Sequence, residues 1–395
     1  MTSGDRFVAR QWEVEHAAAW RSWVAGPESS RMSDFQRLAT AVKVLTRHWA
    51  AHGDSASSVV QCLPSTMGRC NELAFATEAE TLAYTIWHLI DRYGRILQVL
   101  DELFTAGHLP LRRKRMSVLE VGAGPSPAAY AVTDFYQDLR AWSASLGEPD
   151  VDIRPVTDLM VLDRGPAWGH LVHNLSEVLM TLGEDRRLRP FGMTYDEFRS
   201  FSVRTEHVEG IDRATRRLIA EADSWDEYLS DHEARSQAIR ERAYPPGGVD
   251  LVVICNFLTH NSMVEEFARE IQSLAGSLTP GGVLVAIGSS GVGYNEIFDE
   301  VTRLATRGNR TLPLPLNSND ILQAHAEGYA HDVVEDAILD CLRYLKATAP
   351  SEFSLIRDEL HPEVRHPGSR KLTFPSFRVA AFKNEGARSQ KRAPA

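Results

Sequence analysis

The chain has 395 residues, enough for two or three domains with a large buried core. Apolar residues make up 43% and charged residues 24%, which is typical of a globular protein and excludes a low-complexity or fibrous chain. The 43 Lys and Arg against 53 Asp and Glu give a formal charge of −10, so the overall field repels phosphate backbones. Nucleic acid is therefore disfavoured as a partner without being excluded.

Residues 1–115 show helical periodicity and predict an all-α amino-terminal region. The clearest helix begins after Thr77, where Glu80 completes the spacing of a capping box. Gly107 and Pro110 end this helix. Its apolar residues recur every three or four positions and are Leu82, Ile86, Leu89, Tyr93, Leu97, Leu100 and Phe104.

From Met116 the pattern changes to short apolar runs separated by helical stretches, which predicts a parallel sheet with helices on both faces. Ser262 and Glu265 have capping-box spacing and predict the helix between the last two central strands, and the run Thr279-Pro280-Gly281-Gly282 predicts a turn. The expected strands are 117–121, 159–162, 250–255 and 282–287, with a weaker one near 201–208. Further on we expect helices near 319–347, a strand at 374–382 and a disordered tail from about residue 385.

A glycine loop follows the first of these strands, in the run Val118-Leu-Glu-Val-Gly-Ala-Gly-Pro-Ser-Pro127. Glycines at this point let a ligand approach the backbone near the positive end of a helix. Pro127 stands where the dinucleotide fingerprint needs its third glycine and suits the first turn of a helix. A nicotinamide or flavin enzyme is therefore the weaker interpretation.

The loop resembles the first motif of the class I S-adenosylmethionine-dependent methyltransferases, an acidic residue and a spacer before Gly-x-Gly. Glu120, Gly122 and Gly124 match it, and Ser126 replaces a frequent third glycine. Three later features follow in the family's order and extend the resemblance over about residues 116–290. They are Asp163 after the second strand, the run Asp250-Leu-Val-Val-Ile-Cys-Asn-Phe-Leu, and the run Leu278-Thr-Pro-Gly-Gly-Val-Leu-Val.

This resemblance implies a Rossmann-like, seven-stranded α/β sheet that binds S-adenosylmethionine and releases S-adenosylhomocysteine. The implied organisation is a helical region at 1–115, the cofactor-binding core at 116–310, and helices with a final sheet strand at 311–395. Asp163 would accept the ribose hydroxyls, although it follows Glu120 by 43 residues, about double the usual spacing. A long first helix or an insertion at 147–155 would explain the excess.

The other implied cofactor contacts lie around the same strand ends. Glu120 would lie near the methionine end, although a structural role for this buried glutamate is the alternative. Asn256 and Phe257 follow the strand at 250–255, which is the fourth in chain order when the weaker strand near 201–208 is counted. They leave it at its carboxyl end and could flank the sulfonium. The residues assigned to the cofactor are Glu120, Gly122, Ala123, Gly124, Pro125, Asp163, Asn256 and Phe257. The adenine contact stays open among Glu206, Glu209 and Asp212.

Two further groups are candidates for substrate chemistry. His260 follows the fourth strand, and a histidine can act as a general base near neutral pH, but capping or packing explains its position equally well. Helices placed before this core often form a lid, so Tyr84, Arg92 and Tyr93 could contact the cofactor or substrate. The competing interpretation is that these aromatics only fill a core.

Neither the cysteines nor the histidine pairs predict a metal site. Cys62, Cys70, Cys255 and Cys341 show no CxxC spacing, and the pairs His170/His173 and His361/His366 lack clustered Cys or carboxylate partners. The amino terminus lacks the apolar run of a signal peptide, and no stretch approaches the roughly 18 apolar residues of a membrane span. We expect a cytoplasmic protein without membrane partners.

The favoured function is methyl transfer to an oxygen or nitrogen of a small molecule. One alternative is a ribosome- or RNA-directed protein, because residues 84–103 are weakly similar to ribosomal-subunit methyltransferase-like proteins. That family's cysteine cluster is missing, and the basic runs at 112–115 and 186–187 are short. A second alternative is a scaffold that binds the cofactor without turnover. The sequence leaves a homodimer open.

Overall fold

The computed structural model describes residues 12–68, 73–111, 116–147, 153, 156–163, 165, 167–183, 248–291, 293–316, 330–360, 372 and 376–386. The expected strand near 201–208, the adenine candidates Glu206, Glu209 and Asp212, and the pair His361/His366 lie outside these residues. None of the helices within them is both long and apolar enough to cross a membrane.

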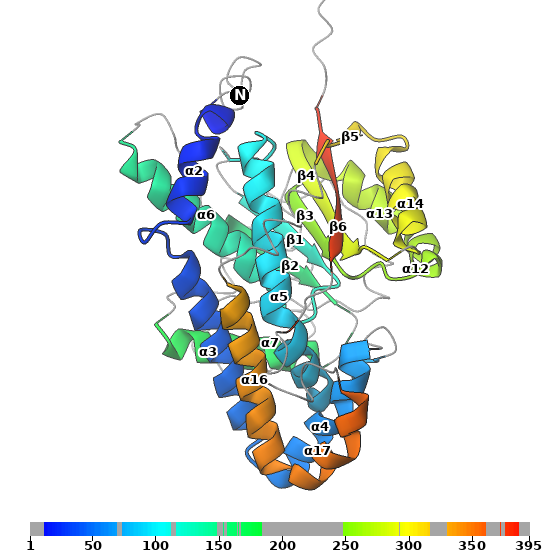
Figure 1. Ribbon diagram of the computed structural model, residues 1–395. Helices are drawn as coiled ribbons and strands as arrows, with labels where there is room; N and C mark the ends of the chain where they lie inside the picture. The colour runs from blue at the N-terminus through cyan, green and yellow to red at the C-terminus, as the bar shows by residue number, and fades with distance from the viewer. Residues whose placement is uncertain are drawn as a thin grey trace, which may run out of the picture.

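A single six-stranded sheet forms the centre of the described part of the chain, in the order β2-β1-β3-β4-β6-β5 (Figure 1). The strands β2, β1, β3 and β4 are parallel, whereas β6 runs antiparallel to both β4 and β5. Their bounds are Met116–Val121 (β1), Val156–Leu162 (β2), Val249–Cys255 (β3), Leu278–Ser289 (β4), Thr311–Pro313 (β5) and Phe377–Asn384 (β6). The four parallel strands confirm the strands predicted from the sequence, although β2 lies at the edge of the described sheet. Strand β5 was not predicted, and a seventh strand is not among the described residues.

Side chains alternate between two cores because successive residues of a strand point to opposite faces. Val118, Leu251 and Val285 face one core, and their neighbours Leu119, Val252 and Leu284 face the other. The first core is covered by helices α5 (Glu78–Thr105) and α6 (Pro127–Ser145), and the second by α12 (Asn261–Glu266), α13 (Ala268–Gly276) and α14 (Tyr294–Thr306). The sheet is therefore sandwiched between helices, as expected.

Helices from both ends of the chain form a helical cap at one end of the molecule, the lower end in Figure 1. Arg47 pairs with Asp340 at 2.9 Å, and the Tyr344 hydroxyl donates to the Arg47 carbonyl at 3.3 Å, which joins α3 to α16. The cap elements are α3 (Arg31–Trp49), α4 (Gly53–Gly68), α7 (Trp168–Thr181), α16 (His331–Thr348) and α17 (Pro350–Ile356), followed by the short 3₁₀ helix η2 (Arg357–Glu359). A further amino-terminal helix, α2 (Ala17–Val24), packs against α5.

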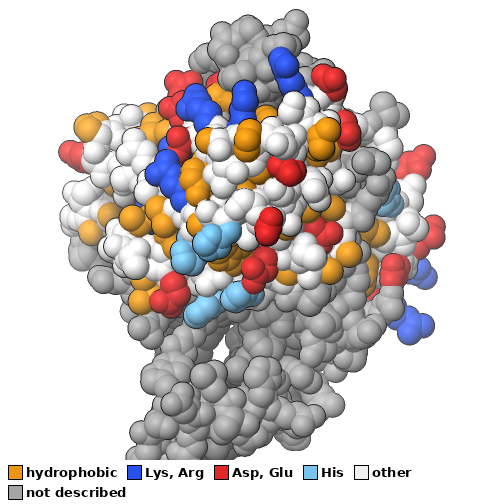
Figure 2. Space-filling model, turned by 90° about the horizontal axis from the view of Figure 1, so that it is seen from below, with side chains coloured by type: hydrophobic (Ala, Val, Ile, Leu, Met, Phe, Trp, Pro, Cys, Tyr) orange, Lys and Arg blue, Asp and Glu red, His pale blue; other side chains and the backbone are white. Residues whose placement is uncertain are grey.

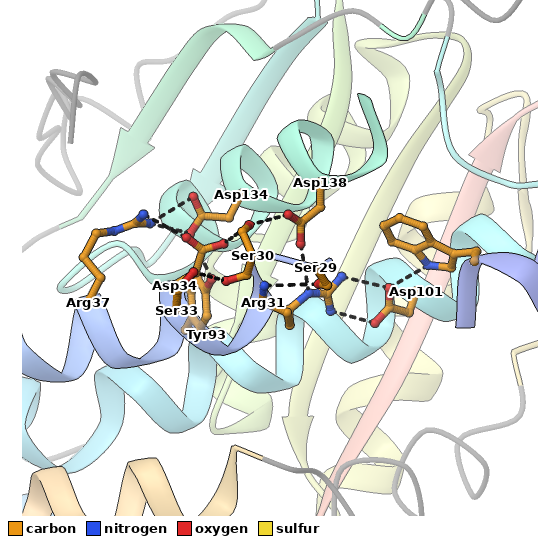
Figure 3. Close-up of polar contacts among 11 residues, drawn as sticks. Ser29, Ser30, Arg31, Ser33, Asp34, Arg37, Tyr93, Asp101, Asp134 and Asp138 are labelled. Atoms are coloured by element: carbon orange, nitrogen blue, oxygen red, sulfur yellow. Dashed lines mark hydrogen bonds and ion pairs between the residues drawn. The ribbon is translucent and has the colours of Figure 1, made fainter. Parts of the chain in front are cut away.

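A buried charge network fixes the amino-terminal helices to α5 and α6 (Figure 3). The Arg31 guanidinium, on α3, binds Asp101 of α5 at 2.8 and 3.2 Å and Asp138 of α6 at 3.4 Å. Arg37 adds a contact of 3.3 Å to Asp134 of α6. Because α6 starts at the glycine loop, this network connects the helical cap to the site described below.

The helix-start predictions have mixed outcomes. The capping box at Thr77 and Glu80 is present, and Pro127 is the first residue of α6, both as predicted. The predicted capping box at Ser262 is wrong: the N-cap of α12 is His260, whose side chain makes no capping hydrogen bond. Helix α12 also ends early, so that Phe267, buried in the second core, separates it from α13.

Two strand boundaries also differ from the prediction. The run Thr279-Pro280-Gly281-Gly282 belongs to β4, where it bulges against the single residue Asp250 of β3. The Thr279 hydroxyl donates to the Asp250 carboxylate at 2.6 Å, which holds the bulge in the sheet. The last strand runs over Phe377–Asn384, two residues beyond the predicted end at 382, and the predicted start at residue 374 lies outside the described residues. Of the expected helices near 319–347, α16 covers 331–348.

Candidate functional site

The glycine loop connects β1 to α6 through residues with left-handed backbone angles. Gly122 and Gly124 have φ of 65° and 52°, which favours glycine, and Ser126 follows with φ of 63°. A side chain at Gly122 would also overlap the ring of Phe257, so two independent requirements select glycine there. The Ser126 amide donates to the Ala123 carbonyl at 2.8 Å and closes the loop.

Glu120 supports this loop from beneath. Its side chain is 1% exposed, and its two carboxylate oxygens accept hydrogen bonds from the Ala128 and Ala129 amides at 2.9 and 3.0 Å. Burial raises the pKa of this carboxyl to about 8, although the two amide hydrogen bonds oppose the increase. Both oxygens thus hold the first turn of α6, as in the structural alternative, and a cofactor contact by Glu120 stays a prediction.

Asp163 connects the loop to the end of β2. Its Oδ2 accepts from the Gly124 amide at 2.6 Å, and its Oδ1 accepts from the Gly165 amide at 3.0 Å. The Ala123 amide adds a bond of 3.0 Å to the Leu162 carbonyl. A carboxylate accepts hydrogens from hydroxyl groups as well as from amides, which is the role that the resemblance gives Asp163. The 19-residue helix α6 accounts for part of the long spacing between Glu120 and Asp163.

An aromatic cluster covers the loop at Gly124. A Cβ atom at Gly124 would lie 3.5 Å from Trp168 and 3.6 Å from Tyr84. The ring centroids of Phe75 lie 4.9 Å from Trp168 and 5.1 Å from Tyr84, and the Arg92 guanidinium lies 4.7 Å from the Tyr84 ring centre. Tyr84 and Arg92, two of the predicted lid residues, therefore lie at the loop.

Phe75 and Trp168 were not among the residues that the sequence singled out. Trp168 is the first residue of α7 and follows Asp163 by five positions, and this short spacing was the signal available. Its side chain is 3% exposed, and its indole Nε1 has no hydrogen-bond partner among the described residues. A buried donor of this kind is costly and fits a site that a ligand completes.

Tyr93 lies on the opposite side of α5 from Tyr84. Nine residues correspond to about 2.5 helical turns, so the two side chains point in opposite directions. The Tyr93 hydroxyl donates to Asp134 at 2.9 Å, and its ring packs edge-on against Phe35 at 4.9 Å. We therefore leave Tyr93 out of the proposed site.

The residues that follow β3 contact the glycine loop at Gly122. Asn256 has a left-handed backbone with φ of 52°, and its backbone amide donates to the Ile287 carbonyl at 2.8 Å. Its side-chain Oδ1 is buried and has no donor among the described residues. Phe257 packs against Gly122 and lies 5.3 Å from the Phe267 ring, in the second core. His260 is exposed at the start of α12.

Within the described residues, the histidines do not form a metal centre. On the outside of the cap, the Nδ1 atom of His170 lies 2.5 Å from a carboxylate oxygen of Glu78. The centre of its ring lies 5.7 Å from that of Trp49. Histidine side chains gather beside acidic ones on the face seen in Figure 2. No group of three His, Cys, Asp or Glu suited to a metal ion exists within the described ranges. Acidic and basic side chains are both present on this face.

No protein-family model matches the sequence, and the search of curated proteins finds no match. Solved structures similar to this chain include the YcgJ protein from Bacillus subtilis, with 11% identity over 74% of this chain and 95% of that chain, and a TM-score of 0.26.

Two others are the mitomycin 7-O-methyltransferase MmcR and a loganic acid methyltransferase with SAH. The first has 12% identity over 93% of this chain and 72% of that chain, with a TM-score of 0.29. The second has 10% identity over 78% of this chain and 96% of that chain, with a TM-score of 0.34. All three TM-scores are below 0.5, so the case for a function rests on the residues of the site.

Proposed function

We propose that this protein is an S-adenosylmethionine-dependent methyltransferase that acts on an oxygen or nitrogen of a small molecule. The observation that carries the proposal is the 2.6 Å hydrogen bond between the Gly124 amide and Asp163 Oδ2. It joins the glycine loop and the acidic residue, which the resemblance assigns to one cofactor, at the carboxyl ends of β1 and β2. Parallel sheets bind ligands at this edge, where the strand order reverses beside β1.

The residues at this edge fit S-adenosylmethionine. Gly122 and Gly124 have no side chain to separate the loop backbone from a ligand, and a carboxylate such as that of Asp163 is the group that accepts ribose hydroxyl hydrogens. The buried Trp168 Nε1 and Asn256 Oδ1, which lack partners among the described residues, offer one donor and one acceptor for the remaining polar atoms. When bound, this cofactor would supply a methyl group already activated for transfer.

The chain's own contribution is positioning and exclusion of water. Tyr84, Phe75 and Trp168 are all buried to more than nine-tenths, so the loop is enclosed instead of open to a large partner. This enclosure supports a small-molecule acceptor. Orientation of two bound reactants can supply much of the rate enhancement when the leaving group is already activated.

His260 is our candidate general base for acceptors that must lose a proton. It follows the carboxyl end of β3 by five residues and is exposed, so it can exchange a proton with solvent. Its backbone carbonyl accepts from the Met263 and Val264 amides at 3.1 and 3.4 Å, which holds the residue at the N-cap of α12. Its side chain makes no capping hydrogen bond there.

The test is transfer of a labelled methyl group from S-adenosylmethionine to a panel of small alcohols, phenols and amines, followed by mass spectrometry. We expect at least one methylated product, and a loss of about 100-fold or more in turnover for His260→Ala. His48→Ala removes another exposed histidine, on α3, and serves as the matched control. A protein that binds S-adenosylhomocysteine but methylates nothing in the panel would support the scaffold alternative.

A further inference from the structure

Three charged side chains on α5 are buried beside the sheet. Asp91, Arg92 and Arg95 are each 5% exposed or less, and Asp91 pairs with Arg95 at 2.6 Å. Charged groups are rarely buried to this degree in a purely structural core, because desolvation costs more than most pairings return. Two cations and one anion give these three side chains a net charge of +1 in the middle of a helix that packs against the sheet.

Arg95 lies at the carboxyl end of β4, away from the glycine loop. Its guanidinium is 5.2 Å from the ring centre of Phe377, and Phe377 pairs with Ser289, the last residue of β4. Both Arg92 and Arg95 act electrostatically on the Cys255 thiol at the end of β3. Arg95 therefore lies near the ends of β4 and β6, on the far side of the point where the strand order reverses, whereas Arg92 lies at the Tyr84 ring beside the glycine loop.

The position along α5 distinguishes Arg95 from the proposed cofactor contacts. Tyr84 touches the loop, and Arg95 follows eleven residues later, about 16 Å along the helix axis. Asp163 and the glycine loop lie at β1 and β2, whereas Arg95 lies at β4 and β6. A group bound at Arg95 would thus lie on the side left for the methyl acceptor.

One donor of Arg95 has no acceptor in the described part of the chain. Its Nε is buried and makes no hydrogen bond, although the same guanidinium is held by Asp91 through Nη2. A guanidinium presents its donors in a planar fork that matches a carboxylate. An incoming carboxylate oxygen would satisfy this buried donor, and a neutral amide oxygen would do so with a weaker hydrogen bond because the acceptor carries no charge.

We propose that Arg95, oriented by Asp91, anchors a carboxylate of the methyl acceptor, so that the substrate is a small organic acid methylated at another atom nearer the glycine loop. This inference rests on the proposed function, because only a methyltransferase would use the bound acid as a methyl acceptor. A carboxylate could also come from the methionine end of the cofactor, and the experiment separates the two sources.

The experiment measures ligand affinity by calorimetry on the full chain. The acids are benzoate, indole-3-acetate and hexanoate, each compared with its carboxamide, with and without S-adenosylhomocysteine. The cofactor probes are S-adenosylhomocysteine and 5′-methylthioadenosine, which lacks the amino-acid end. The variant Arg95→Lys keeps the charge beside Asp91, and Arg303→Lys, in an exposed pair on α14, is the matched control.

We expect at least one acid to bind the wild type more than tenfold better than its carboxamide. Arg95→Lys should weaken that acid at least tenfold and leave S-adenosylhomocysteine affinity within about twofold, and Arg303→Lys should change neither. The comparison of acid with carboxamide needs only the wild type, so it stands even if Arg95→Lys misfolds.

Three results would overturn the inference. The first is that no acid binds, and the second is that acids and carboxamides bind equally. The third is that Arg95→Lys weakens S-adenosylhomocysteine tenfold without affecting 5′-methylthioadenosine, which would assign the carboxylate to the cofactor. Failure of the wild type to bind S-adenosylhomocysteine contradicts the proposed function, while the acids alone still test Arg95.

Discussion

The two faces of the sheet are covered by helices of different chemistry. The buried residues of α12, α13 and α14 are all apolar. Helices α5 and α6 instead bury charged residues, among them Asp91, Arg92, Arg95, Asp134 and Asp138. The glycine loop, the aromatic cluster and the predicted lid residues also lie on this charged side. The charged face thus carries the aromatic cluster and the buried cations of the proposed site, while the apolar face contributes Phe257 and His260.

The largest expected effect comes from removing the central cation of the charged face. Arg31→Ala leaves the buried Asp138 without its cation and Asp101 without its bidentate partner. We expect the free energy of unfolding to fall by about 3–5 kcal/mol, as when one partner of a buried ion pair is deleted. Urea denaturation measures the loss. A loss below about 1 kcal/mol would show that the network contributes little to holding the cap.

A cavity in the apolar face should be slightly less costly and should not depend on pH. Leu284 is fully buried on the side of α13 and α14, so Leu284→Ala should cost about 2–5 kcal/mol. The same denaturation series at pH 5 and pH 8 should give the same cost, because no titratable group is changed. A cost that varied with pH would contradict the division into an apolar and a charged face.

Glu120 should make the stability of the charged face depend on pH. Its pKa in the folded protein is about 8, raised from the usual 4.5 by burial, so the folded state holds the proton more tightly than the unfolded state. This contribution is greatest below pH 4.5 and is lost as pH rises to about 8, at up to about 1.4 kcal/mol per pH unit.

Unfolding of the wild type and Glu120→Gln between pH 5 and 8 checks this dependence. Relative to the wild type, Glu120→Gln should become steadily more stable across the range. Glu300→Gln, at a partly exposed site on α14, should run parallel to the wild type. Parallel curves for Glu120→Gln would show that Glu120 is ionised when buried.

The smallest expected effect separates the two sides of α5. Tyr93→Phe removes one hydrogen bond to Asp134 and should cost about 1 kcal/mol in unfolding free energy without changing ligand affinity. Tyr84→Leu, beside Gly124, should instead weaken S-adenosylhomocysteine binding several-fold. Calorimetry on both variants checks this, and equal losses of affinity would remove the distinction.

The sequence predicts the sheet better than the site. Continuous apolar runs identify the four buried parallel strands, and Thr77 with Glu80 identifies the start of α5. Local pattern fails where tertiary packing decides. Phe267 interrupts the helix after Ser262, and the bulge at Thr279 stays in the sheet because Asp250 binds it.

Site residues were predicted where a backbone motif reveals them. The glycines and Asp163 follow strands and could be placed, and their mutual hydrogen bond is present. Helical periodicity alone does not decide which of Tyr84 and Tyr93 lies at the glycine loop. That choice depends on which face of α5 meets the loop, and the packing of α6 determines it. Phe75 and Trp168 lack any motif, and their contact depends on how the cap meets the sheet.

The most direct test of the proposed function is calorimetric titration of S-adenosylhomocysteine into the wild type, Asp163→Asn and the exposed control Asp336→Asn. We predict saturable binding by the wild type and the control, with at least tenfold weaker binding by Asp163→Asn, about 1.4 kcal/mol. No binding by the folded wild type, or equal affinity for Asp163→Asn, would contradict the assignment of this site.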